Sequence, residues 1–299
     1  MPFDFTGKII AVSGAASGIG FATAQYLYSA GASLSLTDVR EDALKAATER
    51  LVTAPSPTTD KQLQAKSADR STLPGAVNAK PDSSTIVHDA PRLLAMTANV
   101  ANSAHVDAWI ARTVEKFAKL DGAANMAGVS SRAAGVHPIT EVSDEDWAFN
   151  IDINLTGTFY CMRAQLRAVQ TSSAGSGNGK TNASIVNASS IYGIQGKACS
   201  ADYSAAKHGV VGLTRSVAKE FGGKGIRVNC VAPGIIDTPM VQNLSPEFLE
   251  GHNRTLQFEQ SLHRMADAEE IARVNAFLLS GESSFVTGAV YVADGGQVC

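Results

Sequence analysis

One stretch constrains the fold of this chain more than any other: an apolar run that leads into a glycine-rich turn and then an amphipathic segment. Residues 8–12 (KIIAV) are apolar and β-branched, which is typical of a buried strand. Glycines follow at Gly14, Gly18 and Gly20, and apolar residues then recur at helical spacing over 21–30. A strand, a glycine turn and a helix in this order predict a dinucleotide-binding unit, with the helix N-terminus facing a pyrophosphate.

An acidic residue after the second apolar run, 33–37, supports this prediction. Asp38 lies where a carboxylate accepts hydrogen bonds from the adenosine ribose hydroxyls. A 2′-phosphate would meet like charge there, and the glycine turn carries no basic residue, so NAD is favoured over NADP. Arg40 keeps NADP open, since a guanidinium can pair with a phosphate. A solvated charge at the start of a helix is the simpler interpretation of Arg40.

A tyrosine and a lysine four residues apart, Tyr203 and Lys207, share one face of a predicted helix. A phenol ordinarily titrates near pH 10 and is a poor acid or base at neutral pH. An ammonium about 4 Å away stabilises the phenolate by roughly 4 kcal/mol, which we expect to lower the phenol pKa by about three units. Such pairs also arise by chance on helix surfaces, so the prediction depends on Ser190, thirteen residues upstream, and on the rest of the chain.

Six ordered motifs besides the glycine turn make the chain resemble a short-chain dehydrogenase/reductase over nearly its whole length. They are NMAG at 125–128, DINLTG at 152–157, IVNASS at 185–190, YSAAK at 203–207, RVNCVAPG at 227–234 leading to Thr238, and VTGAVYVADGG at 286–296. The resemblance implies a catalytic tetrad. Tyr203 is the expected general acid/base, and Lys207 lowers its pKa and holds the nicotinamide ribose. Ser190, with Ser189 as its rival, bonds the substrate oxygen, and Asn154 holds a water that links Lys207 to solvent.

The resemblance also implies the cofactor contacts. Thr238 is expected to bond the nicotinamide carboxamide, and Ile236 to contact it through its backbone. The predicted cofactor residues are Gly14, Ser17, Gly18, Ile19, Gly20, Asp38, Asn99, Val100, Asn125, Ala127, Gly128, Tyr203, Lys207, Pro233, Gly234, Ile236 and Thr238. Two positions depart from the family pattern: Met126 replaces an asparagine, and Asn99 replaces an acid near the adenine. An amide still accepts one hydrogen bond, so we expect weaker adenine binding and an intact tetrad.

Alternating apolar strands and helical segments predict a single α/β domain over residues 1–299. The expected strands are 8–13, 33–37, 92–97, 122–126, 183–189, 226–232 and 289–293, and the expected helices are 18–30, 40–52, 103–119, 144–170, 202–222 and 267–280. This order predicts a doubly wound parallel sheet of about seven strands, Rossmann-like, with helices on both faces. The ligand then lies outside the strand C-termini.

Two segments interrupt or follow this pattern. Residues 53–92 hold five of the ten prolines and no Phe, Trp or Tyr, which predicts a long surface loop. We interpret it as a tolerated insertion, with an interface or lid role as the alternative, and the shorter polar stretch 171–182 in the same way. Residues 239–264 follow the nicotinamide turn and carry apolar side chains among polar ones, which predicts a mobile lid over the substrate.

The substrate is predicted to be a hydrophobic small molecule, because the residues around the tetrad are mostly apolar. The predicted contacts are Ser190, Tyr192, Cys199, Tyr203 and Met240, with Ile191, Ile194 and His137 completing the wall. The sequence therefore predicts an NAD(H)-dependent oxidoreductase of a secondary alcohol or ketone, with a cyclic, polyketide-like or terpenoid-like substrate of secondary metabolism. Three alternatives stay open: an NADP-dependent ketoreductase, a family member doing non-net-redox chemistry with bound nucleotide, and a nucleotide-sensing binding protein.

Composition argues against other classes of partner. The net charge is −3 without a basic run, which disfavours nucleic acid. No apolar run approaches eighteen residues, so we expect no membrane segment and a cytoplasmic enzyme. Four cysteines without a Cys-x-x-Cys pair, and six histidines without ligand spacing, predict no metal.

The chain is also expected to assemble with copies of itself. The helices predicted at 144–170 and 202–222 carry more apolar residues than one core-facing stripe requires. The surplus residues are Phe159, Tyr160, Met162, Leu166, Val210, Val211, Leu213 and Val217. The family precedent then implies a homotetramer, with a homodimer as the alternative.

Overall fold

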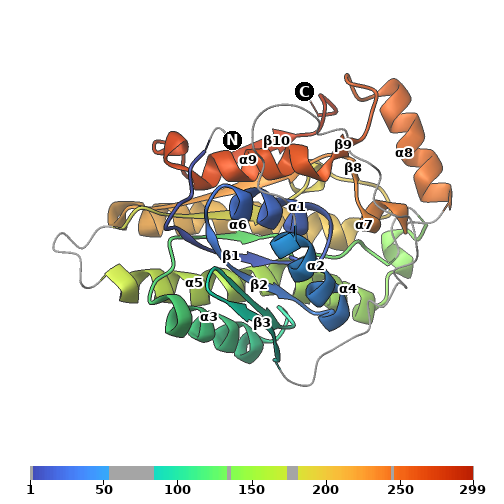
Figure 1. The fold of residues 1–299 in the computed structure, drawn as a ribbon. Helices are drawn as coiled ribbons and strands as arrows, with labels where there is room; N and C mark the ends of the chain where they lie inside the picture. The colour runs from blue at the N-terminus through green and yellow to red at the C-terminus, as the bar shows by residue number, and fades with distance from the viewer. Residues whose placement is uncertain (1–2, 54–83, 133–135, 174–180, 244–245, 299) are drawn as a thin grey trace.

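A central sheet of eight strands organises the part of the chain that the computed structural model describes (Figure 1). The described residues are 3–53, 84–132, 136–173, 181–243 and 246–298. The strands are β1 (Ile9–Ser13), β2 (Ser33–Asp38), β3 (Ile86–Ala90), β4 (Leu93–Thr97), β5 (Gly122–Asn125), β6 (Ala183–Ala188), β7 (Ile226–Pro233) and β10 (Val290–Ala293). Their order in the sheet is β10-β7-β6-β5-β1-β2-β4-β3, and all the pairings are parallel except that of β3 with β4. The predicted doubly wound α/β fold is confirmed, with eight strands rather than about seven.

Helices cover both faces of this sheet (Figure 1). They are α1 (Gly18–Ser29), α2 (Glu41–Thr53), α3 (Ser103–Phe117), α4 (Asp144–Ile151), α5 (Gly157–Ser173), α6 (Ala201–Phe221), α7 (Pro239–Gln242), α8 (Pro246–Phe258) and α9 (Ala268–Leu279). Short 3-10 turns lie at Ile139–Glu141, Ile191–Gly193, Gly222–Lys224 and Gly281–Ser283, and a small two-stranded sheet pairs β8 (Ile236–Asp237) with β9 (Ala266–Asp267). Helices α1, α2 and α9 contribute to one core, and α3, α5 and α6 contribute to the other.

Strand alternation builds these two cores. In β1, Ile10 and Val12 pack into the core shared with α1, α2 and α9, whereas Ile9 and Ala11 pack into the opposite one. This follows from the two-residue period of a strand, which sends successive side chains to opposite faces. Both faces are covered by helices, so the strands are apolar throughout rather than alternating with polar residues.

The helix predicted over 144–170 is not continuous. It is divided by a π-helical turn at Asp152–Thr156, between α4 and α5. A π turn inserts one extra residue into the helical repeat and often marks a functional site. Here the turn contains Asn154, whose side chain is fully buried. Apolar periodicity does not predict this interruption, because the residues on either side keep a helical spacing.

The prediction of a continuous loop over 53–92 is wrong at both ends of the segment, which are the parts of it that the structure describes. Thr53 is the last residue of α2, and 86–90 form β3, an antiparallel edge strand on β4. Arg92 fixes the turn after β3 by donating to the carbonyls of Tyr28 and Ala32, at 2.8 Å each. The prediction used the average composition of the whole segment, and this average did not reveal the short strand at 86–90. Residues 54–83 lie outside the described residues, as do 174–180 of the second predicted insertion, whose first residues complete α5.

Most of the apolar surface that the sequence assigned to an interface is buried within the chain itself. Five of the eight residues, Met162, Leu166, Val210, Val211 and Val217, are at most 8% exposed. Phe159 is 40% exposed, and Tyr160 and Leu213 are partly buried. These residues therefore do not by themselves imply a partner chain. Among the described helices, none is long and apolar enough to cross a membrane.

Candidate active site

The predicted site residues gather at one edge of the sheet, where the parallel strands end. The glycine turn follows β1, Asp38 ends β2, Asn99 and Val100 follow β4, and Asn125, Ala127 and Gly128 end or follow β5. Ser190 follows β6, and Pro233, Gly234, Ile236 and Thr238 end or follow β7. Parallel strands share one C-terminal edge, and ligands of doubly wound sheets bind there. Tyr203 and Lys207 come to this edge from the first turns of α6.

Ser190, Tyr203 and Lys207 form one contiguous cluster. The Ser190 hydroxyl is hydrogen-bonded to the phenol of Tyr203, and it also accepts from the backbone N–H of Tyr192 at 3.2 Å. The Nζ atom of Lys207 lies 5.5 Å from the centroid of the Tyr203 ring and donates to the carbonyl of Ala188 at 3.0 Å. Lys207 is only 4% exposed, so its ammonium is held beside the phenol rather than in solvent.

The protonation of this cluster differs from the expectation. Burial raises the pKa of Tyr203 to about 12, although the Ser190 hydrogen bond acts in the opposite direction. Burial also lowers the pKa of Lys207 to about 8. The pKa of Tyr203 is therefore raised overall in the protein's own groups and not lowered by about three units, because the expectation counted the attraction of the ammonium and omitted desolvation. At neutral pH the cluster holds a neutral phenol beside a charged lysine.

Asn154 joins the cluster through a close approach at Gly128. A Cβ atom on Gly128 would lie 2.8 Å from Oδ1 of Asn154 and 3.4 Å from Nζ of Lys207, so only a glycine fits between them. The Asn154 amide is fixed on both sides: Oδ1 accepts from the N–H of Val129 at 3.1 Å, and Nδ2 donates to Oδ1 of Asn150 at 2.7 Å. All four predicted catalytic residues thus occupy one site.

The turn after β1 is shaped for a backbone approach to a phosphate. Gly14 has a φ of +66°, and a Cβ atom there would lie 2.7 Å from the N atom of Ala127. Helix α1 begins directly after this turn at Gly18, and its first turn carries no acidic residue. Its free N–H groups and partial positive charge suit a pyrophosphate. The local geometry fits the dinucleotide that the motif predicts, with Ile19 and Gly20 in the first turn.

At the adenosine end, Asp38 and Arg40 form an ion pair. Oδ1 of Asp38 accepts from the backbone N–H and Nε of Arg40 at 3.1 and 3.2 Å, and Oδ2 accepts from the N–H of Ala16 at 3.1 Å. Nη2 of Arg40 donates to Oγ of Ser17 at 2.8 Å. Asp38 is 7% exposed, whereas the Arg40 side chain is 31% exposed. The arginine thus connects the carboxylate to the glycine turn.

Two predicted cofactor residues have side chains that are already engaged elsewhere. Nδ2 of Asn125 donates to Gln165 and Asn187, at 3.1 and 2.9 Å, and its Oδ1 accepts from Gln165 at 2.8 Å. This buried amide network stabilises the end of β5, so the Asn125 side chain holds the strand end that carries the site. Oδ1 of Asn99 accepts from the N–H of Ala101 at 3.0 Å and shapes the turn after β4.

Val100 and Thr238 pack against neighbouring parts of the site. A Cβ atom on Gly157 would lie 2.9 Å from Cγ2 of Val100, which places this side chain against the start of α5. Thr238 is buried, its hydroxyl donates to the carbonyl of Ile236 at 3.3 Å, and its methyl group lies beside Gly18. The residues predicted for the nicotinamide and for the pyrophosphate therefore adjoin.

On the substrate side, Tyr192 packs against the tyrosine of the cluster. Its ring meets that of Tyr203 edge to face, with centroids 6.5 Å apart. Cys199 is partly buried and adopts a φ of +54°, unusual for a residue with a side chain. Met240 is 42% exposed at the start of α7. His137, which was predicted to complete the wall, is exposed, and its Nδ1 lies 3.0 Å from a carboxylate oxygen of Glu141.

The predicted lid contains α7 and α8. Residues 244–245 and the side chains of Phe248 and Leu249 lie outside the described residues. Two of the other apolar residues assigned to the lid, Phe258 and Leu262, are 75% and 61% exposed. Glu259, which follows α8, helps to raise the pKa of Tyr192 after the larger effect of burial.

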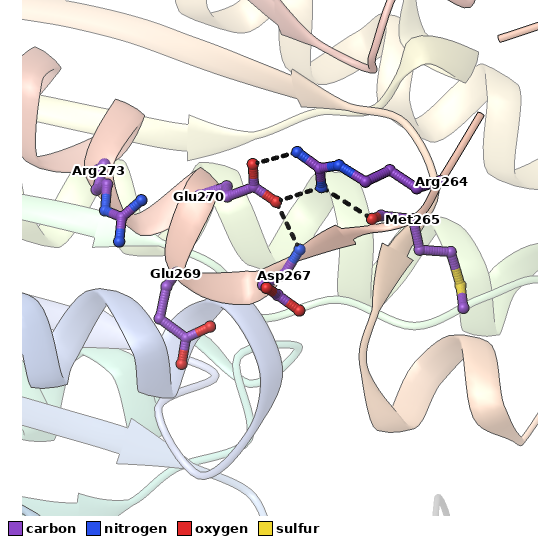
Figure 2. A pocket seen from close by; sticks show the side chains of 6 residues that line it. All are labelled: Arg264, Met265, Asp267, Glu269, Glu270 and Arg273. Atoms are coloured by element: carbon purple, nitrogen blue, oxygen red, sulfur yellow. Dashed lines mark hydrogen bonds and ion pairs between the residues drawn. The ribbon is translucent and has the colours of Figure 1, made fainter. Parts of the chain in front are cut away.

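A cavity of about 510 Å³ lies elsewhere, at the N-terminus of α9 (Figure 2). Its walls are Arg264, Met265, Asp267, Glu269, Glu270 and Arg273, and it includes none of the predicted site residues. Arg264 donates to both carboxylate oxygens of Glu270, at 2.8 Å each, and Glu270 accepts from the N–H of Asp267 (Figure 2). Arg264 and Glu270 thus pair with each other beside the capping box that begins α9, and we assign the cavity no ligand.

Family profiles match almost the entire chain. The profile described as "short chain dehydrogenase" matches residues 8–79, and the one described as "Enoyl-(Acyl carrier protein) reductase" matches residues 75–297. The chain belongs to the short-chain dehydrogenase/reductase family. Membership makes it an oxidoreductase of CH–OH groups and implies a nicotinamide nucleotide, NAD or NADP.

Relatives within the short-chain dehydrogenase/reductase family align over nearly their full lengths. "Short-chain dehydrogenase/reductase aba4" of Botryotinia fuckeliana is 40% identical over 99% of this chain and 98% of that protein. "Cis-4-hydroxycyclohexanecarboxylate dehydrogenase" of Sinomonas cyclohexanicum is 36% identical, with 98% and 97% covered. The crystal structure of a levodione reductase superposes with a TM-score of 0.78 at 32% identity, with 98% of each chain covered.

Sequence reasoning missed several polar residues that support this short-chain dehydrogenase/reductase site. Asn150 holds Asn154, and the interval of four residues between them on a helix is a signal that could have identified it. Gln165 and Asn187 hold Asn125, but they lie 40 and 62 residues away in sequence. Contacts of that kind depend on how β5, β6 and α5 pack, which a single sequence does not reveal.

Proposed function

We propose that this protein is an NAD(H)-dependent oxidoreductase that interconverts a secondary alcohol and a ketone on a hydrophobic small molecule, with Tyr203 as general acid/base. The observation that carries the proposal is the cluster of Ser190, Tyr203 and Lys207 at the sheet edge, with Gly128 leaving no room for a side chain beside Asn154. A phenol, a hydroxyl and a buried ammonium together can bind an oxygen atom and move its proton.

Each residue of the cluster has a distinct role in this proposal. Ser190 donates to the substrate oxygen and fixes the phenol of Tyr203. In the oxidation, Tyr203 in its phenolate form takes the hydroxyl proton; in the reduction, its phenol gives a proton to the carbonyl oxygen. Lys207 supplies positive charge beside the phenol and a donor for a ribose hydroxyl. When bound, the nicotinamide nucleotide accepts or supplies the hydride and, in its oxidised form, adds positive charge that favours the phenolate.

Asp38 supports NAD over NADP as the cofactor. Its carboxylate is buried at the end of β2, where a 2′-phosphate would meet negative charge. Arg40 is the observation that favours a second candidate, an NADP-dependent ketoreductase, because its guanidinium adjoins this position. Arg40 already binds Asp38 and Ser17, however, so recruitment by a phosphate would require breaking an ion pair.

A cyclic substrate agrees with the site and with the relatives. The names of two relatives refer to levodione and to cis-4-hydroxycyclohexanecarboxylate. In this chain, the aromatic ring of Tyr192 lies beside Tyr203, and Met240 is an exposed apolar side chain at the start of α7. We infer that an apolar ring carrying one hydroxyl or keto group is the preferred substrate.

One assay tests these proposals together. The purified protein is incubated with a panel of cyclic and acyclic alcohols and ketones, each with NAD(H) or NADP(H), and nicotinamide absorbance is followed. We expect turnover of cyclic secondary alcohols with NAD. Turnover with NADP(H) alone would establish the second candidate. Cofactor binding without redox change on any panel member would favour non-net-redox chemistry.

The assembly remains a prediction. Phe159 is exposed on α5 and the family precedent favours association, so we propose a homotetramer, with a homodimer as the alternative. Size exclusion coupled to light scattering measures the molar mass directly. A single species at the mass of one chain, 31.1 kDa, would contradict association.

A further inference from the structure

The tail, which we define as residues 294–298, follows the edge strand β10 and has no role in the predicted site. It forms a tight turn around its own first residue: Oδ1 of Asp294 accepts from the N–H of Gly296 at 2.9 Å, and Oδ2 accepts from the N–H of Val298 at 2.8 Å. Gly295 and Gly296 have φ values of +68° and +80°, which residues with a side chain rarely adopt. The carboxylate and the two glycines thus hold the tail in one shape.

The tail packs against the end of the predicted lid. The N–H of Leu262 donates to the carbonyl of Gly295 at 3.0 Å, and the hydroxyl of Ser261 donates to the carbonyl of Gly296 at 3.1 Å. Gln260 is buried and lies directly on the tail, because a Cβ atom on Gly295 would be 2.8 Å from its Cδ atom. Three consecutive lid residues are therefore fixed on two consecutive glycines.

The start of the tail also contacts the turn after β7, from which the lid begins. The N–H of Gly234 donates to the carbonyl of Ala293 at 3.1 Å, and a Cβ atom on Gly234 would lie 2.8 Å from Cα of Asp294. The first lid helix, α7, begins at Pro239, and the strands just before and just after the lid, β8 and β9, pair with each other. The tail thus connects the end of the lid to the part of the sheet where the lid starts.

The end of the lid also acts on the substrate side through charge. Glu259, beside Gln260, helps to raise the pKa of Tyr192 after the larger effect of burial. The ring of Tyr192 in turn meets that of Tyr203 edge to face. A displacement of the end of the lid would therefore change the surroundings of a predicted substrate contact.

We propose that the tail holds the end of the lid in its substrate-binding position, and that Gly295 and Gly296 are positioning residues for the substrate. The inference rests on the proposed function. Closure of a lid excludes water and fixes the substrate in place. Because the tail already orders the end of the lid, less conformational entropy is lost when the substrate binds. Loosening this contact should therefore weaken substrate binding more than it slows the chemical step.

The test compares alanine substitutions at glycines that share one backbone conformation. In Gly295→Ala the new Cβ would lie 2.8 Å from Gln260, whose buried amide is held by the N–H of Arg264 at 3.0 Å. Gly288→Ala, the control, has a φ of +72° and would place its Cβ 3.5 Å from that of Ala218, an ordinary contact outside the lid. For an alcohol that the unaltered protein oxidises, we expect Gly295→Ala to raise KM about tenfold and to change kcat by less than about threefold, because the contact contributes to binding alone. The dissociation constant for NADH should stay unchanged, and Gly288→Ala should leave all three quantities unchanged.

A second set of variants tests whether the contact itself is responsible. A Cβ atom on Gly296 would lie 2.7 Å from Oγ and 2.9 Å from Cβ of Ser261, so Gly296→Ala should raise KM as well. Ser261→Gly removes both of these atoms. Residues in direct contact have non-additive effects, so the double variant should have a lower KM than Gly296→Ala alone.

Other outcomes overturn the proposal. An unchanged KM in Gly295→Ala, with or without a lower free energy of unfolding, would assign the tail a purely structural role. An equal rise of KM in Gly288→Ala would show that backbone strain, and not the lid contact, is responsible, and a loss of NADH affinity would assign the tail to the cofactor turn. If Gly295→Ala does not fold, Ser261→Ala, which removes one hydrogen bond to the tail, should raise KM by a smaller factor, and an unchanged KM there would equally overturn the proposal. Turnover of the unaltered protein tests the proposed function separately, since the tail is judged only by the ratio of variant to unaltered enzyme.

Discussion

The two ends of the cofactor site use charge in different ways. At the catalytic end, Lys207 is almost fully buried without an acidic partner among the described residues, and burial shifts the pKa values of Tyr203 and Lys207 in opposite directions, to about 12 and about 8. At the adenosine end, Asp38 is paired with Arg40, which is partly exposed to solvent. Desolvation dominates the first end, and direct charge pairing dominates the second.

This difference predicts how each end responds to substitution. Water does not reach a desolvated group and cannot replace it, so the loss of that group should strongly change turnover or the protonation of its neighbours. A partly exposed ion pair contributes less, because water and salt compete for both partners. We therefore expect large effects on chemistry at the catalytic end, and smaller effects on cofactor choice at the adenosine end.

The largest effect is expected for Tyr203→Phe. The substitution keeps the ring and removes the only proposed proton donor, so kcat should fall by about 10²–10⁴-fold, the range for loss of general acid–base catalysis. Steady-state kinetics on the best panel substrate measures it, with Tyr28→Phe, near the opposite edge of the sheet, as the matched control. A Tyr203→Phe enzyme with near-normal kcat would remove Tyr203 from the mechanism.

The next effect concerns stability and its pH dependence. The pKa of Lys207 is about 8 in the folded chain and 10.5 in its ordinary state, so the unfolded chain binds more protons between these values. The free energy of unfolding therefore rises with pH across this window. Below pH 8, Lys207 is charged in the folded chain, and its burial lowers the free energy of unfolding by the full amount. Lys207→Met should raise the unfolding free energy at neutral pH by roughly 3 kcal/mol, with the gain fading towards pH 10.5.

Chemical denaturation across this pH range measures the effect in both proteins. Lys219→Met, on the exposed side of α6, is the control and should show no pH-dependent gain. If Lys207→Met destabilised the protein equally at every pH, the desolvation account of the catalytic end would be incorrect.

Asp38→Asn should change cofactor choice and leave turnover with saturating NAD intact. Removing the charge relieves the repulsion of a 2′-phosphate and frees Arg40 to pair with it. The ratio of NADPH to NADH dissociation constants should therefore fall about tenfold, equivalent to about 1.4 kcal/mol. Calorimetric titration with both cofactors measures the ratio. An unchanged ratio would mean that Asp38 does not distinguish the 2′-hydroxyl of the adenosine ribose from a 2′-phosphate.

Arg40→Ala should produce a smaller effect of opposite sign. Without the guanidinium, the Asp38 carboxylate is no longer neutralised, so discrimination against NADPH should increase by a few-fold at most, as expected for a partly exposed pair. The same titrations at low and high salt test this, because the increase should shrink as salt screens the charge. A weaker preference for NADH in Arg40→Ala would assign Arg40 a direct role at the ribose.

The sequence predicted where the site lies better than how its charges behave. The ends of β1, β2 and β6 carry the glycine turn, Asp38 and Ser190 because strands and helices alternate, and that pattern is local. The pKa values of Tyr203 and Lys207 depend on how deeply α6 packs, which no spacing reveals. The amide network around Asn125 was missed for the same reason, since Gln165 and Asn187 are distant in sequence. The strand β3 was missed although it pairs with the next strand, because the composition of the whole 53–92 segment was averaged. The π turn at Asn154 was missed because apolar spacing continues through it.

The most direct test of this account measures turnover and cofactor affinity on the same two variants. For Tyr203→Phe we expect kcat to collapse while the dissociation constants for NADH and NADPH stay unchanged. For Asp38→Asn we expect the ratio of those two constants to change while kcat at saturating NAD stays close to that of the unaltered enzyme. Separate effects of this kind would establish that chemistry and cofactor choice belong to opposite ends of the site. If either variant altered both properties together, the division between a desolvated catalytic end and a charge-paired adenosine end would be contradicted.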